Sequence, residues 1–226
     1  LRSGIALILN IPESQIRVIS PHVGGAFGAK SGLQPEYLLV AALAWKLGRA
    51  IKWLETIHES MLATTHARDQ RQHVCAAFRR DGTLLGMTID ITSNIGAWNA
   101  SPTRPTILLT IMAATGPYRV PAVRLDARCV VTNTTPIAPY RGNGRPEATF
   151  LLERVMDMAA ARLGLDPVTI REKNLLRPED FPYTSPTGVP YDSGNYPAVL
   201  AEALRRFDYA AARREQAALR AQGRLV

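Results

Sequence analysis

The amino-acid sequence predicts an α+β fold, with helices and short strands mixed along the chain. Two alternating apolar stretches flank Asp81-Gly82, a strong two-residue hairpin signal. Two glycine-rich loops each lead into a stretch with helical apolar spacing. Strands and helices do not alternate at a steady spacing, so a doubly wound parallel sheet is not expected.

The first third is expected to alternate between helices and short strands. Leu1–Asn10 has the spacing of an amphipathic helix, and Ile16–Ile19 reads as a short strand. Gln34–Leu47 reads as a helix that Gly48 ends, and Ile51–Leu54 as a second short strand. The apolar face of the long helix is formed by Tyr37, Leu38, Ala41, Ala42 and Trp45.

The hairpin arms are Gln72–Arg80 and Thr83–Ser93, and Val123–Thr132 is a further strand rich in β-branched residues. Alternation assigns to the apolar faces of the arms the residues Val74, Ala76, Phe78, Leu85, Met87, Ile89 and Ile91.

The last third is expected to be largely helical. Gly164 ends its first helix, and Asp166-Pro167 supplies an N-cap and a first-turn proline to its second. Phe181–Tyr196 is expected to be loop, so the predicted division is between residues 1–180 and 181–226. The expected helices are Glu147–Leu163, Pro167–Leu176, Pro197–Phe207 and Tyr209–Gln222.

The composition is that of a soluble globular protein. Of the 226 residues, 46% are hydrophobic and 20% charged, which excludes a disordered chain. The longest purely apolar run, Tyr37–Trp45, is far shorter than the roughly 20 residues that span a membrane. A cytoplasmic protein without a membrane span is therefore expected. The chain begins without Met and ends in a polar helix, which suggests a piece of a longer polypeptide.

The net charge of +8 does not by itself predict nucleic-acid binding. The 27 Lys and Arg residues are spread along the chain, with local excess in Arg68–Arg80 and Arg205–Arg224. A nucleic-acid surface needs basic residues gathered on one face with aromatic residues between them. An anionic cofactor explains a mild basic surplus equally well.

Two cysteines, Cys75 and Cys129, limit the redox chemistry of this chain. An iron–sulfur cluster normally needs four thiolates, so the chain cannot hold one alone. The set His66, His73 and Cys75 matches no common zinc spacing. No metal ligand is therefore expected from the protein side chains.

The first glycine-rich loop, Pro21–Lys30, contains GGAFGAK and joins a predicted strand to the segment that leads into a helix. Backbone N–H groups of such a loop can face an anion. Ala29 separates Gly28 from Lys30, which excludes the P-loop pattern, and the dinucleotide fingerprint cannot be read here.

The second loop, Pro139–Pro146, places Arg141 and Arg145 around two glycines at the start of a helix. Guanidinium and backbone donors that converge there suit a phosphate or oxo group. Taken alone, each loop would more often be a structural turn than a ligand site.

Together the loops resemble a known family. GGAFGAK and PYRGNGRPEATFLLERVMD are similar to the paired signatures of the xanthine dehydrogenase, aldehyde oxidase and carbon monoxide dehydrogenase large subunits. GRAIKWLETIHESMLATTHARD, TGPYRVP and IREKNLLRPEDFPYTSPTGVPYDSGNY follow in the family's order. The resemblance runs from about Ile16 to about Tyr209, and it implies part of a molybdopterin-binding domain.

The resemblance implies a molybdenum ion held by the dithiolene sulfurs of molybdopterin, in many bacteria as its cytosine dinucleotide. Arg141 would lie beside the metal and the substrate, and Phe27, Ser31 and Asn143 would line the substrate pocket. His22 would touch the pocket or pterin, or form a structural hydrogen bond. The residues implied to surround the cofactor are Gly24, Gly25, Ala26, Phe27, Gly28, Arg141 and Gly142.

Three positions depart from well-known members of the family. Gly142 stands where copper-using carbon monoxide dehydrogenases have Cys, whose soft thiolate binds Cu(I). Ser31 and Asn143 stand where xanthine oxidisers have Glu and Phe. The resemblance therefore favours hydroxylation of N-heterocycles or aldehydes, with water as the oxygen source.

The family's catalytic glutamate comes from a Gly-Glu-rich motif that this chain lacks after Asn195. Glu147 and Glu36 are better explained as acidic residues in first helical turns. The family passes electrons to iron–sulfur clusters and FAD on other subunits or domains, commonly in a dimer of heterotrimers. The chain is thus expected to need the remainder of the large subunit, and to be inactive alone.

Two other functions remain open at this point. One is a molybdopterin-binding or assembly module that performs no chemistry, such as one product of a split gene. The other is a basic nucleic-acid or scaffold protein that shares only the fold. A continuing reading frame with the Gly-Glu motif would favour the enzyme over the assembly module.

Overall fold

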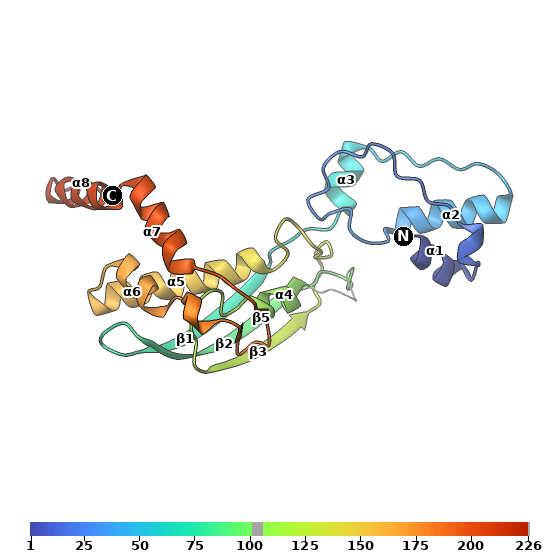
Figure 1. The fold of residues 1–226 in the computed structure, drawn as a ribbon. Coiled ribbons are helices and arrows are strands. Elements are labelled where there is room, and N and C mark those ends of the chain that lie inside the picture. The colour runs from blue at the N-terminus through green and yellow to red at the C-terminus, as the bar shows by residue number, and fades with distance from the viewer. Residues whose placement is uncertain (101–105, 226) are drawn as a thin grey trace. The chain divides into compact units, whose positions relative to one another are not determined.

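The computed structural model describes residues 1–100 and 106–225, and these form a mixture of helices and small sheets. The predicted α+β class is confirmed (Figure 1). The described α-helices are α1 (Arg2–Leu9), α2 (Pro35–Leu47), α3 (Ile57–Ala63), α4 (Thr106–Met112), α5 (Arg145–Leu163), α6 (Pro167–Asn174), α7 (Tyr196–Phe207) and α8 (Tyr209–Ala221). The described strands are β1 (Gln70–Phe78), β2 (Leu84–Asn94), β3 (Val123–Val130), β4 (Tyr183–Thr184) and β5 (Pro190–Tyr191).

The chain folds into two compact units, each built from segments that are distant in the sequence. Unit 1 contains Leu1–Arg71, Ile91–Ile111 and Ala127–Glu147. Unit 2 contains Gln72–Asp90, Met112–Asp126 and Ala148–Val226. Unit 2 therefore contains both the tip of the hairpin and the C-terminal helices. The division after residue 180 that the sequence suggests stays a prediction.

Unit 1 holds the helices of the first third. α2 begins after Gln34 and ends at Gly48, whose φ of 61° is left-handed, as the sequence predicts. Ile16–Ile19 and Ile51–Leu54 are not strands, so those two predictions are wrong. No strand among the described residues pairs with either segment, and a β-strand needs a partner.

The helix α3 was not predicted, although its start carries a clear signal. The Thr56 hydroxyl accepts from the Glu59 amide, and the Glu59 carboxylate accepts from the Thr56 amide over 2.8 Å. This reciprocal pair is a capping box. None of the residues on the predicted apolar face of α2 is buried, and Trp45 is 64% exposed.

The hairpin predicted at Asp81-Gly82 is present, and the sheet order is β1-β2-β3. Met87, Ile89 and Ile91 of the central strand are almost completely buried. Leu85 is exposed and Leu84 is buried instead, which corrects the predicted face at that position. Buried residues alternate regularly from Met87 to Ile91, but Leu84 is three positions before Met87, so the alternation is interrupted between them. A β-bulge, in which one extra residue is inserted in a strand, has this effect.

A buried asparagine fastens α6 to the hairpin within unit 2. The Asn174 Oδ1 accepts from the Leu84 amide, and its Nδ2 donates to the carbonyls of Gly82 and Ile170 over 2.7–2.8 Å. Asn174 is 3% exposed, so all three hydrogen bonds are shielded from water. The N-cap predicted for α6 is also present, since the Asp166 carboxylate accepts from the Val168 amide.

The C-terminal segment differs from its prediction in one respect. β4 and β5 form a small antiparallel sheet inside the expected loop, with Tyr183 opposite Tyr191. α7 and α8 follow as predicted, and the Tyr209 hydroxyl donates to the Asp166 carboxylate. No helix in residues 1–100 or 106–225 is long and apolar enough to cross a membrane.

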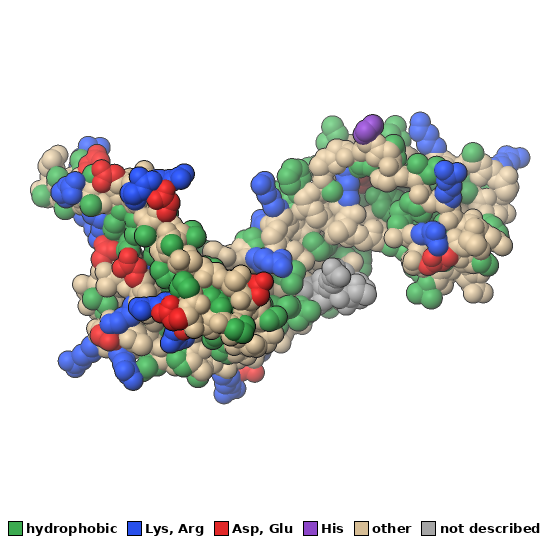
Figure 2. Space-filling model, viewed as in Figure 1, with side chains coloured by type: hydrophobic (Ala, Val, Ile, Leu, Met, Phe, Trp, Pro, Cys, Tyr) green, Lys and Arg blue, Asp and Glu red, His purple; other side chains and the backbone are tan. Residues whose placement is uncertain are grey.

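The surface carries both signs of charge. On the face drawn in Figure 2, Lys and Arg side chains are interspersed with Asp and Glu, and they do not form one continuous basic stripe. Because a nucleic-acid surface needs such a stripe, this face gives no support to nucleic-acid binding.

Candidate functional site

The first glycine-rich loop is an irregular segment of unit 1 that precedes α2. Phe27 and Gly28 both have left-handed backbones, with φ of 49° and 102°. The Ser31 hydroxyl donates to the Gly28 carbonyl over 2.6 Å and closes the end of the loop. Among the described residues, the amides of Gly24, Gly25, Ala26 and Phe27 donate to no backbone carbonyl. These N–H groups are therefore available to an acceptor outside the loop.

The second loop is a tight double turn that runs into α5. The Asn143 amide donates to the Tyr140 carbonyl over 2.7 Å, and the Arg145 amide donates to the Gly142 carbonyl over 3.2 Å. Gly144 lies against α4, where a Cβ would be 2.7 Å from the amide nitrogen of Thr110. Glycine is needed there because both its φ of 88° and the close approach exclude a side chain.

The two loops, separated by more than a hundred residues, lie against each other. The Arg141 amide donates to the Phe27 carbonyl over 2.7 Å. The Arg141 guanidinium carbon lies 5.7 Å from the centre of the Phe27 ring, within cation–π range. A Cβ on Gly28 would lie 2.7 Å from the Pro139 carbonyl oxygen, so glycine permits this approach.

A third segment, which was not predicted from the sequence, holds the second loop from another side. The His66 amide donates to the Pro136 carbonyl, and the Ala138 amide donates to the His66 carbonyl, both over 2.9 Å. Two residues further on, the Arg68 guanidinium donates to the Arg141 carbonyl. The same guanidinium lies 4.8 Å from the centre of the Tyr140 ring. The stretch THARD, part of the family resemblance, was the only sequence signal for Arg68.

The predicted pocket residues lie on these two loops or, for Ser31, directly after the first. Phe27 is 57% exposed, so its ring does not anchor the loop in the core. Ser31 is exposed, and its hydroxyl is already used by Gly28. Asn143 has a left-handed backbone, and its side-chain Oδ1 is buried without a hydrogen-bond partner in the described residues.

These observations fit an anionic cofactor that offers hydrogen-bond acceptors to the two loops. A Cβ on Gly24 would meet no protein atom within 4 Å, so a ligand can approach the backbone there, and unbonded amides and the exposed Arg141 guanidinium supply donors. The buried Asn143 Oδ1, which has no donor among the described residues, is a further atom of these loops that could hydrogen-bond to a ligand. The residues present therefore fit the pterin cofactor that the sequence resemblance implies.

The other titratable residues singled out in the sequence do not gather into a second site. Glu147 and Glu36 lie in the first turns of α5 and α2, where carboxylates favour the helix dipole. His22 lies exposed in the first loop, just before its glycines. The His73 Nε2 lies 3.7 Å from the Cys75 Sγ on β1. In the part of the chain that the structure describes, no three His, Cys, Asp or Glu side chains gather as metal ligands.

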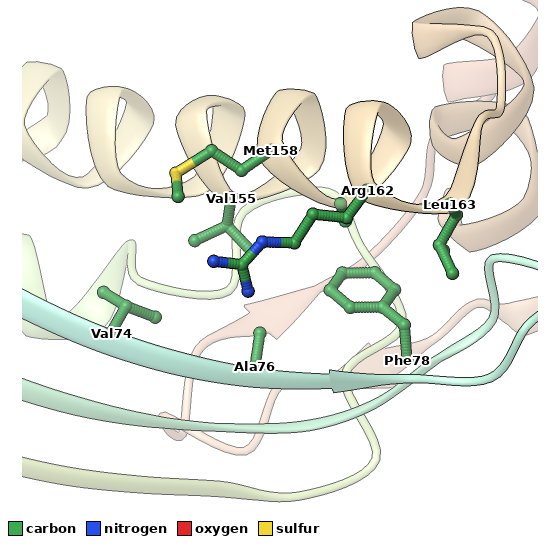
Figure 3. Close-up of a pocket in the computed structure, with 8 residues that line it drawn as sticks. Val74, Ala76, Phe78, Val155, Met158, Arg162 and Leu163 are labelled. Carbon is green, nitrogen blue, oxygen red and sulfur yellow. The ribbon is translucent and has the colours of Figure 1, made fainter.

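A separate apolar groove lies in unit 2 between β1 and α5 (Figure 3). Its volume is about 230 Å³, and the Arg162 side chain extends along it above Ala76 and Phe78. Among the described residues that line the groove, Arg162 alone is charged, and it lies in the last turn of α5, where a cation favours the helix dipole. The residues that line the groove belong to neither glycine-rich loop.

The α+β fold and the two glycine-rich loops that contact each other are those of a cofactor-binding module. Residues 1–175 match the family model described as "Molybdopterin cofactor-binding domain". The chain belongs to this family, and the family recognised from the sequence motifs is confirmed.

Similar proteins support the same conclusion. The chain is 38% identical over 226 residues to the carbon monoxide dehydrogenase large chain of Hydrogenophaga pseudoflava, covering 98% of this chain and 28% of that protein. It is 40% identical over 229 residues to the 6-hydroxypseudooxynicotine dehydrogenase complex subunit gamma of Paenarthrobacter nicotinovorans, covering 98% and 29%. The crystal structure of quinoline 2-oxidoreductase from Pseudomonas putida 86 superposes with a TM-score of 0.91 at 37% identity, covering 98% and 28%. The chain thus spans less than a third of the length of these relatives.

Proposed function

We propose that this chain is the first molybdopterin-binding portion of a molybdenum hydroxylase large subunit. The single observation that carries the proposal is the contact between the two glycine loops through Arg141 and Phe27. It brings the unbonded amides of the first loop and the exposed Arg141 guanidinium to one place, in the loop where Gly24 leaves the backbone uncovered. When bound, molybdenum with its pterin would supply a water-derived nucleophile and accept the electrons of the oxidation.

The chain's own residues would bind the cofactor and orient the substrate. The amides from Gly24 to Phe27 would donate to oxygen atoms of the cofactor, and Gly142 would leave room for it. Arg141 would place its guanidinium beside the reacting atoms, with the Phe27 ring as a wall on which the guanidinium rests. Ser31 and Asn143 would form a neutral part of the substrate pocket.

We propose N-heterocycles or aldehydes as substrates, and not carbon monoxide. The φ of Gly142 is 95°, and a Cβ there would lie 2.7 Å from the Pro146 ring. A thiolate at this position would therefore need a different loop, so no Cu(I) ligand is available here. Two similar proteins named above carry heteroaromatic compounds in their names, and the third is named for carbon monoxide.

The whole enzyme would include the remainder of the large subunit, an iron–sulfur subunit and a FAD subunit, and would act as a dimer of heterotrimers in the cytoplasm. Two of the relatives are named as a large chain and as a subunit of a complex. The catalytic glutamate would come from outside this chain. The alternative is a non-catalytic molybdopterin-binding or assembly module of a split subunit.

Elemental analysis and dye-linked assays test the proposal. The full complex should contain molybdenum and reduce dye with quinoline, nicotinate or an aldehyde, and it should be inert under carbon monoxide and xanthine. The isolated chain should purify with much less than one molybdenum per chain and show no turnover. Robust dye reduction under carbon monoxide together with copper in the full complex would contradict the substrate assignment. If the isolated chain contained one molybdenum per chain and turned over substrate, the proposal that it needs the remainder of the large subunit would be contradicted.

A further inference from the structure

Both backbone polar groups of Arg141, its amide and its carbonyl, are hydrogen-bonded to other segments of unit 1. Its amide donates to the Phe27 carbonyl of the first loop over 2.7 Å. Its carbonyl accepts from the Arg68 guanidinium, which reaches the loop from a different segment of unit 1. Neither partner belongs to the second loop itself, so the orientation of this residue depends on long-range contacts.

Arg68 makes two kinds of contact with the same short stretch. One guanidinium nitrogen donates to the Arg141 carbonyl, and the guanidinium carbon lies 4.8 Å from the centre of the Tyr140 ring. A planar guanidinium can satisfy both contacts at once, because its edge donates while its face stacks. A hydrogen bond from a charged donor is also stronger than one between neutral groups.

The backbone of Arg68 is itself in an unfavourable conformation. Its φ is 66°, in the left-handed region that a long side chain rarely adopts. Such a conformation persists where the surrounding contacts determine it, and it is often found next to functional sites. The pairing of His66 with residues 136–138 fixes the segment just before Arg68 and directs it to the second loop.

We infer that Arg68 is a positioning residue, which holds the Arg141 carbonyl and thereby sets where the Arg141 guanidinium lies. The functional value of this role rests on the proposed function of Arg141 at the cofactor site. The positioning itself is a property of this chain and does not require the cofactor. Arg68 is not a catalytic residue, because it acts only through Tyr140 and Arg141.

Amide hydrogen exchange of the 226-residue chain, followed by NMR, tests the positioning directly. Arg68→Gly is the sharpest variant, since glycine accepts the positive φ and removes only the side chain. The Arg141 amide keeps its own acceptor, the Phe27 carbonyl, so its exchange reports how often the loop opens. Because Arg68→Gly removes the charge-assisted bond to the Arg141 carbonyl, opening becomes easier, and the protection factor of the Arg141 amide should fall at least about tenfold. Arg68→Lys keeps one cationic donor and should restore part of the protection.

Two further variants separate positioning from charge and from folding. Arg71→Ala removes an exposed arginine three residues away and should leave the Arg141 amide unchanged. Tyr140→Leu removes the stacking surface alone and should give an intermediate loss of protection. Unchanged protection in Arg68→Gly, or equal losses in Arg68→Gly and Arg71→Ala, would overturn the inference.

The full enzyme provides the second readout. Arg68→Gly should lower kcat at least about fivefold while KM for the same heterocycle stays within about twofold, and Arg68→Lys should recover part of kcat. A fall in Arg141 protection with unaltered kcat would keep the positioning role and count against the proposed function of Arg141. Unaltered protection overturns the positioning role whatever the enzyme does.

Discussion

The Arg141 amide and the Phe27 carbonyl form a 2.7 Å hydrogen bond that joins two loops more than a hundred residues apart. Phe27 in turn lies under the Arg141 guanidinium, at 5.7 Å from ring centre to guanidinium carbon. Each residue thus fixes both the backbone and the side chain of the other. The candidate site depends on this pair more than on either loop alone.

Arg141→Ala should reduce turnover of the full enzyme at least about tenfold, because a charge-assisted contact at the reacting atoms is worth roughly 1.5–3 kcal/mol. Arg145→Ala is the matched control in the same loop. Arg145 is the first residue of α5, and its guanidinium makes a long 3.5 Å contact with the Gly142 carbonyl, so its loss should cost less. Steady-state kinetics measure both effects, and equal, negligible changes would place the metal elsewhere.

Phe27→Ala should separate the ring from the backbone contact. The variant keeps the carbonyl that accepts from Arg141 but removes the ring, worth roughly 0.5–1 kcal/mol as an exposed cation–π partner. KM for an aromatic substrate should rise about two- to fivefold, while the molybdenum content stays unchanged. Loss of molybdenum on this substitution would show that the Phe27 ring organises the cofactor loop and does not merely line the substrate pocket.

Asn174→Ala should destabilise the fold by about 2–4 kcal/mol, since it breaks three shielded hydrogen bonds and leaves buried partners unsatisfied. Chemical denaturation of the chain measures this free energy of unfolding. Lys173→Ala, which removes the neighbouring exposed ion pair with Asp81, should cost much less. Similar costs for both variants would contradict the assignment of Asn174 as the principal fastening of α6 to the hairpin.

Tyr118 should titrate late at alkaline pH. Burial, and then the Glu153 carboxylate to which its hydroxyl donates over 2.9 Å, raise its pKa above the usual value. Because the folded-state pKa is raised, the stabilisation is fully present below about pH 10 and is lost as pH rises from there toward the folded pKa. Absorbance at the tyrosinate band against pH should lose its latest step in Tyr118→Phe. The same step at an ordinary pH in the native chain would contradict the burial argument.

Local signals determined most of the secondary structure. Gly48 and Gly164 end their helices with left-handed backbones, Asp166 caps α6, and Asp81-Gly82 turns the hairpin. These outcomes depend on a few neighbouring residues, so the sequence alone predicts them. The family motifs likewise identified the family, because several matched in order along one chain.

Long-range packing decided what the sequence could not. Ile16–Ile19 and Ile51–Leu54 have the composition of strands, but strands require partners, and pairing is a property of the whole fold. Leu84 is buried in place of Leu85, and its amide donates to Asn174 of α6, a long-range contact that alternation alone cannot reveal. Both loops were predicted from the sequence, and only the tertiary structure brought Arg68 to Arg141 and Arg141 to Phe27, because contacts between distant segments leave no local pattern.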